Sequence, residues 1–267
     1  MVARQEDQAR LDQGAGRVTL TADLTGKTAI VTGASSGFGA HFARLLARSG
    51  ARVVVGARRM SALEGLVEEI QRDGGDASAL PLDVRDLDSI RAFAQAMPAD
   101  ILVNNAGVGT TGPVLDQTRD NWDFVLDTNL KGAFFMATEV ARSMRARGDG
   151  GSIVNIASIL GLRQGGGVAP YAIAKAGLVQ MTKQLALELA RFGIRVNALA
   201  PGYFGTEINN NFFETDAGAA LIKRVPMRRL GDLTDLDGPL LLLASDASRF
   251  MTGSVIAVDG GHLTSGL

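Results

Sequence analysis

Short apolar runs alternate with helical patterns along almost the whole chain. The strand-like runs, such as Thr28–Thr32, are solid stretches of apolar residues and do not alternate between apolar and polar. Strands of that kind are buried on both faces, which is typical of a parallel sheet covered by helices. Strand and helix alternating in this order predict a single α/β domain built on a Rossmann-like, doubly wound parallel sheet.

Apolar spacing and glycines set the limits of the expected elements. In the first helix, Phe42, Leu45 and Leu46 share one face, and Gly50 ends the helix. The expected strands are Thr28–Thr32, Arg52–Val55, Ser78–Leu82, Ile101–Asn104, Ser152–Ile156, Arg195–Leu199 and Val255–Val258. The expected helices are Gly37–Ser49, Ser61–Arg72, Leu87–Met97, Asn121–Arg147, Tyr171–Phe192 and Leu236–Ala244.

The composition argues against several classes of function. The 27 Lys and Arg are balanced by 28 Asp and Glu, so we expect no nucleic-acid partner. With no Cys and two His, we expect no metal site built from thiolates and imidazoles, although carboxylates alone remain able to hold Mg²⁺. No apolar run approaches the roughly 18 residues of a membrane span, so we expect no membrane partner.

The beginning of the chain differs from the rest. It mixes Arg with Glu6, Asp7 and Asp12 and lacks the apolar stretch of a signal peptide. We therefore expect a flexible arm over residues 1–23, a single domain over residues 24–267, and a cytoplasmic location.

A glycine-rich turn, TGASSGFG at Thr32–Gly39, joins the first strand to the first helix. Glycines allow positive φ and a close backbone approach to a pyrophosphate, and the free N–H groups of the following helix attract an anion. The spacing is G-x-x-x-G-x-G, not the commoner G-x-G-x-x-G, and a plain glycine turn is the alternative. Its place at the start of a strand–helix series favours dinucleotide binding. The candidate residues are Gly33, Ser35, Ser36, Gly37, Phe38 and Gly39.

The end of the second strand indicates which dinucleotide is bound. NAD sites usually carry an acid there, whereas this chain has Ala57, Arg58 and Arg59. Because a guanidinium can pair with a 2′-phosphate, we expect NADP(H), with NAD(H) bound more weakly. Arg58 takes the main role and Arg59 a lesser one, unless both are simply a solvated strand end. Asp83 and Val84 are expected beside the adenine, although Asp83 could instead cap the next helix.

Tyr171 and Lys175 lie four residues apart on an expected helix and so share one face. The chain has only two Tyr and five Lys, which makes such a pair rare by chance. Ser158 follows an expected strand, at the carboxyl edge where open α/β sheets bind ligands. The three suit carbonyl reduction. Tyr171 moves the proton, Ser158 hydrogen-bonds the carbonyl oxygen, and Lys175 is expected to lower the Tyr171 pKa from about 10 toward neutrality.

These motifs together resemble the short-chain dehydrogenase/reductase family, over nearly the whole chain. The further motifs that carry the resemblance are NNAG at Asn104–Gly107, PGYFGTE at Pro201–Glu207 and DGG at Asp259–Gly261. The resemblance implies that Asn129 completes the catalytic set by holding a water that leads to the lysine; a kink or cap inside the long helix is the alternative. It also implies cofactor contacts from Asn105, Ala106, Gly107, Pro201, Gly202 and Thr206.

The resemblance implies an enzyme that transfers a hydride between NADP(H) and a carbonyl or secondary alcohol of a small molecule. A 3-oxoacyl-thioester reductase and a sugar-acid or polyol dehydrogenase are alternative activities. A non-catalytic dinucleotide sensor is the alternative of a different class, but such proteins typically lose the tyrosine or the lysine. Apolar surface on the helices Asn121–Arg147 and Tyr171–Phe192, together with the resemblance, predicts a homotetramer.

Overall fold

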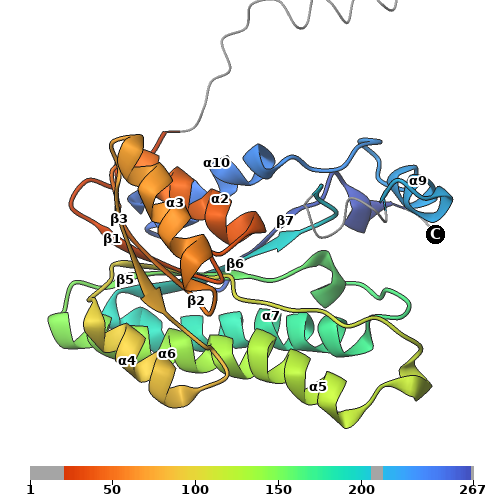
Figure 1. Cartoon of the computed structure of the whole chain (residues 1–267), viewed down its shortest axis with the longest axis horizontal. Helices are drawn as coiled ribbons and strands as arrows, with labels where there is room; N and C mark the ends of the chain where they lie inside the picture. Colours follow the sequence, from red (N-terminus) through yellow and green to blue (C-terminus); the bar gives the residue numbers. More distant parts are fainter. Residues whose placement is uncertain (1–20, 206–212, 266–267) are drawn as a thin grey trace, which may run out of the picture.

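Seven parallel strands form one sheet in the computed structural model, which describes residues 21–205 and 213–265 (Figure 1). They are β1 (Thr28–Thr32), β2 (Arg52–Ala57), β3 (Asp76–Pro81), β4 (Ile101–Asn104), β5 (Gly151–Ile156), β6 (Ile194–Pro201) and β7 (Val255–Val258). The order across the sheet is β3-β2-β1-β4-β5-β6-β7, and every neighbouring pair is parallel. The predicted Rossmann-like, doubly wound sheet is confirmed. Its order reverses between β1 and β4, which is where ligands bind in such sheets.

Helices cover both faces of the sheet (Figure 1). One layer holds α2 (Gly37–Arg48), α3 (Met60–Arg72) and α10 (Asp237–Ala244), and the other holds α4 (Leu87–Ala96), α5 (Arg119–Leu126), α6 (Ala133–Arg147) and α7 (Ala169–Leu189). The short helix α9 (Asp216–Ile222) lies away from both layers. Strand side chains alternate between the two cores: Val53 and Val55 pack in the first, and Val54 in the second.

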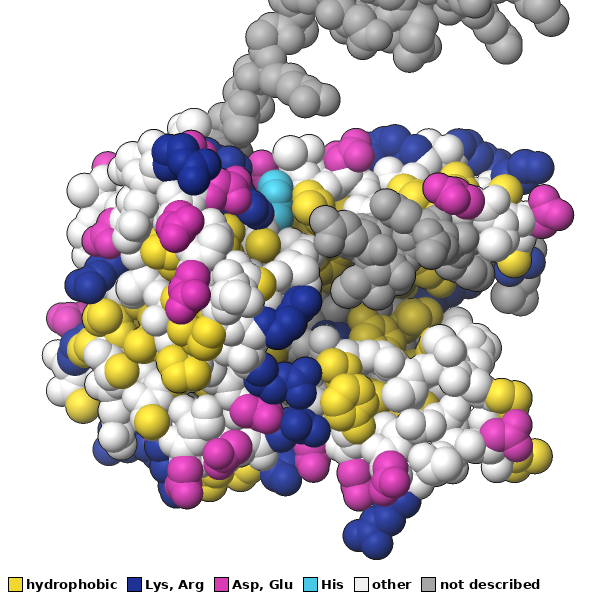
Figure 2. All heavy atoms as spheres, in the orientation of Figure 1, with side chains coloured by type: hydrophobic (Ala, Val, Ile, Leu, Met, Phe, Trp, Pro, Cys, Tyr) yellow, Lys and Arg dark blue, Asp and Glu magenta, His cyan; other side chains and the backbone are white. Residues whose placement is uncertain are grey.

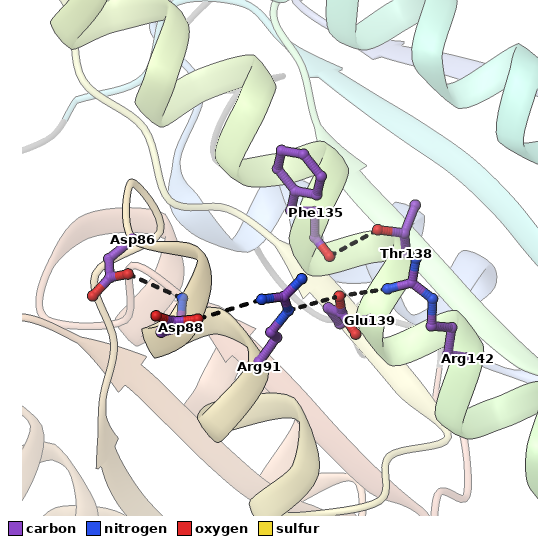
Figure 3. A network of polar contacts seen from close by, with 7 residues as sticks. All are labelled: Asp86, Asp88, Arg91, Phe135, Thr138, Glu139 and Arg142. Atoms are coloured by element: carbon purple, nitrogen blue, oxygen red, sulfur yellow. Dashed lines mark hydrogen bonds and ion pairs between the residues drawn. The ribbon is translucent and has the colours of Figure 1, made fainter.

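Helices α4 and α6 are also joined by a polar network at the surface (Figure 3). Arg91 lies 3.3 Å from Asp88 and 3.7 Å from Glu139, which also pairs with Arg142. Asp86 caps the start of α4 by accepting the N–H of Asp88. Exposed ion pairs contribute about 0–1 kcal/mol each, so the buried apolar faces of these helices, more than the network, hold them together.

The single helix predicted over Asn121–Arg147 is wrong. The helix begins at Arg119, and a π-helical turn, η2 (Asp127–Gly132), separates α5 from α6. Tertiary contacts hold this turn. The side chain of Asn129 bonds both backbone groups of Val108, at 2.7 Å each. Local helical spacing contains no information about such contacts, and π-turns are often found at functional sites.

The other element limits lie close to those expected. The third strand begins at Asp76 instead of Ser78, and a 3₁₀ turn follows α7. Residues 1–20 of the expected arm lie outside the described residues, so the arm and the domain limits stay predictions. None of the helices within residues 21–205 and 213–265 is long and apolar enough to cross a membrane.

Candidate active site

The glycine turn after β1 is packed too tightly for side chains at two positions. A Cβ at Gly33 would lie 2.7 Å from the Cα of Ala106, and one at Gly39 would lie 2.5 Å from the carbonyl oxygen of Gly33. Gly33 and Gly37 also have positive φ, at 68° and 56°. The turn therefore depends on glycine both for its backbone conformation and for its close packing.

Residues after β4 hold the glycine turn in place. The hydroxyl of Thr32 accepts the N–H groups of Asn105 and Ala106, both at 3.0 Å. The side-chain amide of Asn105 donates to the carbonyl oxygens of Thr32 at 2.9 Å and of Gly33 at 3.3 Å. The NNAG motif thus supports the turn directly, at the crevice between β1 and β4.

The start of α2 fits a bound phosphate group. Ser36 is the N-cap residue, but its side chain makes no capping hydrogen bond, and the first turn contains no acid. A Cβ at Gly37 would meet nothing within 4 Å, so the space in front of the helix is open. The helix dipole and the uncapped N–H groups favour an anion here.

Arg59 lies over the glycine turn. Its guanidinium donates to the hydroxyls of Ser35 at 2.9 Å and of Ser36 at 3.2 Å. Arg58 is also exposed, and its charge helps to lower the pKa of Asp83. The structure therefore brings Arg59, which sequence reasoning gave the lesser role, into contact with the turn.

Asp83 and Val84 follow β3 as expected but differ in their surroundings. Burial raises the Asp83 pKa, yet hydrogen bonds from Arg85 outweigh that effect and hold the pKa below its usual value. Val84 is buried in the core of the second layer. Asp83 is thus a partly buried, ionised hydrogen-bond acceptor. Val84 can contact a ligand only through its backbone and the small exposed part of its side chain.

Ser158, Tyr171 and Lys175 converge at the carboxyl end of β5. Ser158 caps a 3₁₀ turn, η3 (Ile159–Gly161), and its side chain hydrogen-bonds that of Tyr171. Lys175 lies one turn further along α7, and its Nζ donates to the carbonyl oxygen of Ile156 at 2.7 Å. The Nζ is 5.6 Å from the centre of the Tyr171 ring.

Burial sets the acid–base properties of this group. It lowers the pKa of Lys175 to about 8. It also raises the pKa of Tyr171 above its usual value, and the hydrogen bond with Ser158 offsets this only in part. Contrary to the expectation, the Tyr171 pKa is therefore not lowered toward neutrality in this structure. The ammonium group of Lys175 bonds Ile156 and is not among the groups that shift this pKa, so Tyr171 keeps its proton at neutral pH.

Asn129 lies in the π-helical turn and is fully buried. A Cβ at Gly107 would lie 3.4 Å from the Asn129 carbonyl oxygen Oδ1 and 3.6 Å from the Lys175 Nζ. Gly107, Asn129 and Lys175 therefore meet around one small space. The Asn129 side chain already makes two hydrogen bonds to Val108, and its role in holding a water that leads to the lysine stays a prediction.

The end of β6 closes the site. The N–H of Gly202 donates to Val258 at 2.9 Å, and a Cβ at Gly202 would lie 2.8 Å from Asp259. Pro201 is buried as the last residue of the strand. The ring of Phe38 packs edge-on against Phe204, which ties the glycine turn to this segment. Thr206 lies outside the described residues.

Sequence reasoning assigned no catalytic or cofactor role to three residues near the reacting centre. The ring of Tyr203 packs against His262, with centres 5.4 Å apart, and Arg163 donates to the carbonyl oxygen of His262 at 2.6 Å. Tyr203 also contributes electrostatically to the raised pKa of Tyr171. Composition alone could have drawn attention to two of these residues, because Tyr203 is one of two tyrosines and His262 is one of two histidines in the chain.

The space-filling view shows a hollow between the two helical layers, on the side where the loops after β4 and β5 lie (Figure 2). Lys and Arg side chains gather along one wall, and hydrophobic side chains lie deeper. A positively charged wall beside an apolar floor suits a phosphate-bearing ligand with an uncharged reacting end.

Comparisons with known proteins agree with this geometry. Residues 33–262 match the family described as enoyl-(acyl carrier protein) reductase. The chain is 42% identical over 249 residues to L-rhamnose 1-dehydrogenase (NAD(P)(+)) of Azotobacter vinelandii, covering 89% of this chain and 97% of that protein. It is 39% identical over 248 residues to gluconate 5-dehydrogenase of Gluconobacter oxydans, covering 91% and 96%. The crystal structure of a gluconate 5-dehydrogenase from Burkholderia cenocepacia, in complex with NADP and tartrate, is 36% identical with a TM-score of 0.88, covering 91% and 97%.

Proposed function

The chain belongs to the short-chain dehydrogenase/reductase family, and from that premise we propose that it transfers a hydride between NADP(H) and a carbonyl or secondary alcohol. It is an NAD(P)-dependent oxidoreductase. The observation that carries the proposal is the cluster of Ser158, Tyr171 and Lys175 at the carboxyl end of β5, beside the glycine turn.

The residues present fit a dinucleotide. The open space at Gly37 and the uncapped start of α2 would hold the pyrophosphate, and Arg58 and Arg59 would hold the 2′-phosphate of NADP(H). When bound, the reduced dinucleotide supplies the hydride. The absence of an acid at Ala57 supports NADP(H) over NAD(H).

In our proposal Tyr171 is the proton donor for reduction. The hydride adds to the carbonyl carbon, the C=O π bond breaks, and the proton of the Tyr171 hydroxyl bonds to the oxygen. Ser158 donates a hydrogen bond to that oxygen as negative charge develops there. Its Oγ accepts the N–H of Leu160 at 3.1 Å, so the hydroxyl proton that Ser158 directs to Tyr171 in this structure is the one it would donate to the substrate oxygen. Alcohol oxidation uses the same groups in reverse.

Lys175 has two proposed roles. Its ammonium stabilises the phenolate that Tyr171 becomes after giving up its proton, and it reaches the ribose of the nicotinamide. A proton from solvent then restores Tyr171, by way of Lys175 and a water held near Asn129. The short distances among Gly107, Asn129 and Lys175 support this route.

Three substrate classes stay open: a small ketone or alcohol, a sugar acid or polyol, and a 3-oxoacyl thioester. Relatives named for rhamnose and gluconate support a sugar or sugar-acid dehydrogenase as the second candidate. A 3-oxoacyl-thioester reductase is supported by a relative named 3-oxoacyl-[acyl-carrier-protein] reductase FabG, of Thermotoga maritima, which is 37% identical over 243 residues. A non-catalytic sensor fits poorly, since Tyr171 and Lys175 are both present and adjacent.

One experiment tests the proposed reaction. Purified protein is assayed with ketones, sugar acids and acyl thioesters, each with NADPH or NADH or their oxidised forms. Tyr171→Phe should lower turnover by about 10²- to 10⁴-fold and leave dinucleotide affinity almost unchanged. Leu115→Phe, a change at a fully exposed side chain in the loop after β4, serves as the control. Wild-type turnover by Tyr171→Phe would refute the assignment.

We propose a homotetramer as the working assembly. A groove of about 460 Å³ lies between the π-helical turn, α6 and α7. Apolar side chains line most of it: Leu126, Leu130, Phe134, Phe135, Met181 and Leu185. Apolar surface of this kind is unfavourable in water, so a second copy of the chain covering it would stabilise both copies.

We propose that the partner is a small molecule and that the chain binds neither nucleic acid nor a membrane. The net charge of −1 argues against nucleic-acid binding, because many phosphate contacts need an excess of basic residues. A cytoplasmic location is part of the same proposal. Imaging or fractionation of cells that express the tagged chain tests it.

A further inference from the structure

Three segments that follow different strands meet beside the reacting centre. Arg163 follows β5 and η3, Tyr203 follows β6, and His262 lies in the 3₁₀ turn after β7, η7 (His262–Thr264). Arg163 donates to the His262 carbonyl oxygen at 2.6 Å, and the rings of Tyr203 and His262 pack edge to face at 5.4 Å. A further ring, that of Phe213, lies 6.3 Å from Tyr203.

This cluster adjoins the catalytic group. Tyr203 follows β6, which pairs with β5 up to Ile156, and the N–H of Ala157 next to Ser158 donates to Leu199 of β6 at 2.7 Å. The turn that leads to Arg163 is also fixed on the catalytic helix, since a Cβ at Gly161 would lie 2.7 Å from the backbone of Lys175. A substrate whose carbonyl meets Tyr171 and Ser158 would therefore extend toward Arg163 and His262.

The cluster carries unbalanced positive charge. Arg163 bonds His262, and Arg224 directly precedes Val225, which packs against Gly260 in the turn before His262. Neither arginine forms an ion pair within residues 21–205 and 213–265. Among the described residues, Asp259 is the acid whose charge acts on His262. Both oxygens of its carboxylate already accept backbone N–H groups, of Gly261 at 2.9 Å and of Leu263 at 2.7 Å. One carboxylate that is engaged in a turn does not neutralise two guanidinium groups.

His262 supplies an independent indication of a ligand. Its side chain is only 7% exposed, and its Nδ1 has no hydrogen-bond partner among the described residues. Burial, followed by the charge of Arg163, lowers its pKa, so the ring is neutral at pH 7. A buried ring nitrogen without a partner is unfavourable, and a bound polar group would improve its surroundings.

We propose that Arg163, Arg224 and His262 form a subsite for a carboxylate on the substrate, so that the enzyme acts on polyhydroxy acids and their oxo forms. This inference rests on the proposed function, because it places the reacting carbon at Tyr171. The planar guanidinium of Arg163 suits a carboxylate, and the Tyr203 hydroxyl and the imidazole suit neighbouring hydroxyls. Neutral ketones have no carboxylate for the two arginines to bind. Acyl thioesters would likewise leave the two arginines without a carboxylate partner in this subsite.

The test measures binding without turnover. Gluconate and glucitol, which differ only by a carboxylate in place of a hydroxymethyl group, are titrated by calorimetry into the NADPH-loaded protein. Neither complex can react, because alcohol and cofactor are both in the reduced form. We expect gluconate to bind at least about tenfold more tightly than glucitol. Arg163→Gln should weaken gluconate by roughly 10- to 150-fold, and glucitol by about twofold at most.

Three further variants separate recognition from folding. Arg163→Lys keeps the charge and should retain part of the gluconate affinity. Arg224→Gln makes no change to the Arg163–His262 hydrogen bond and should weaken gluconate but not glucitol. Arg249→Gln is the matched control: it is exposed and follows Ser248, which bonds Arg195 at the amino end of β6, the opposite edge of the sheet. Its affinities should equal those of wild type.

Equal binding of gluconate and glucitol, no binding of either, or equal losses in Arg163→Gln and Arg249→Gln would overturn the subsite. If the subsite is overturned but the protein still reduces a neutral ketone with NADPH, the proposed hydride transfer holds without the subsite. If gluconate binds as expected but no carbonyl or alcohol turns over, the proposed function fails and the subsite stands.

Discussion

Burial of single ionisable residues controls the chemistry of this site. Lys175 is almost fully buried and has a pKa of about 8, while the pKa of Tyr171 is raised. As pH rises, the ammonium therefore loses its proton before the phenol does. Below about pH 8 the pair consists of a neutral proton donor and a cation that can stabilise the phenolate left behind.

The activity should follow the charge of Lys175. Its folded pKa lies below the usual 10.5, so the ammonium is present below about pH 8 and is lost as pH rises through that value. We expect kcat/KM for carbonyl reduction to fall above about pH 8. A pH–rate profile of wild type checks this, with Lys183→Met, at an exposed lysine on the same helix, as the control. A flat profile from pH 7 to about pH 10 would contradict it.

Arginines at the end of β2 should determine cofactor preference. Arg59 contacts both serines of the glycine turn, and Arg58 lies beside it in sequence. Arg58→Ala and Arg59→Ala should each weaken NADPH by roughly 10- to 150-fold, since a bond to a charged group contributes about 1.5–3 kcal/mol. NADH affinity should change by less than about threefold.

The measurement is kcat/KM for NADPH and NADH in wild type and both variants. Ala57→Asp should favour NADH, because a carboxylate there repels the 2′-phosphate and accepts ribose hydroxyls. Arg72→Ala, an exposed arginine at the other end of α3, is the control. Equal losses for NADPH and NADH would show that these arginines do not bind the phosphate.

At the scale of elements, the π-helical turn determines how the residues around Lys175 are arranged. It places Asn129 against Val108 and Gly107, and it brings Gly132 against Val84 in the segment after β3. A regular helix would rotate Asn129 away from these contacts, because a π-turn adds one residue without adding a turn. The regular α-helical pattern is therefore interrupted at this turn, and the hydrogen bonds between Asn129 and Val108 next to Lys175 compensate for the interruption.

Two glycine-to-alanine changes in helical segments should have opposite effects. In Gly132→Ala the new Cβ would lie 2.4 Å from the carbonyl oxygen of Val84, so the backbone must move, at a cost of about 1–3 kcal/mol. In Gly65→Ala, within α3, nothing lies within 4 Å, and the gain should be about 0.5–1 kcal/mol. Urea unfolding measures both. A stabilised Gly132→Ala would show that the turn tolerates a side chain.

At the scale of the molecule, the sheet arranges the cofactor and substrate parts of the site in order. The glycine turn follows β1, Asn105 follows β4, Ser158 follows β5, and Tyr203 follows β6. Since all strands are parallel, these residues meet at one edge, across the reversal of strand order. The apolar groove is lined by residues of α7 from Gly177 to Leu185, beyond Tyr171 and Lys175, so the surface that we propose for assembly does not include the catalytic pair.

Disruption of the groove should change the oligomeric state. Phe134 is 40% exposed and lines the groove, and a carboxylate in its place would be buried by a second copy. We expect wild type to sediment as a tetramer and Phe134→Glu as a smaller species, at micromolar concentration. Leu115→Glu, at a fully exposed residue outside the groove, should remain tetrameric. A monomeric wild type would refute the proposal.

The sequence determined the architecture and the identity of the central chemical groups. Solid apolar runs determine that strands are buried on both faces, and glycine spacing determines where the backbone must turn, so the sheet was predictable. Tyr171 and Lys175 share a face because they are four residues apart, which local geometry alone ensures. For such features the relevant interactions lie within a few residues of one another.

Only the tertiary structure decided the features that depend on distant contacts. The interruption at Asn129 depends on a pairing with Val108, 21 residues away. The raised pKa of Tyr171 depends on how deeply the fold buries it, and the cluster of Arg163, Tyr203 and His262 depends on three segments that follow different strands. Desolvation and contact between such segments are properties of the packed chain. The order of residues alone therefore does not reveal them.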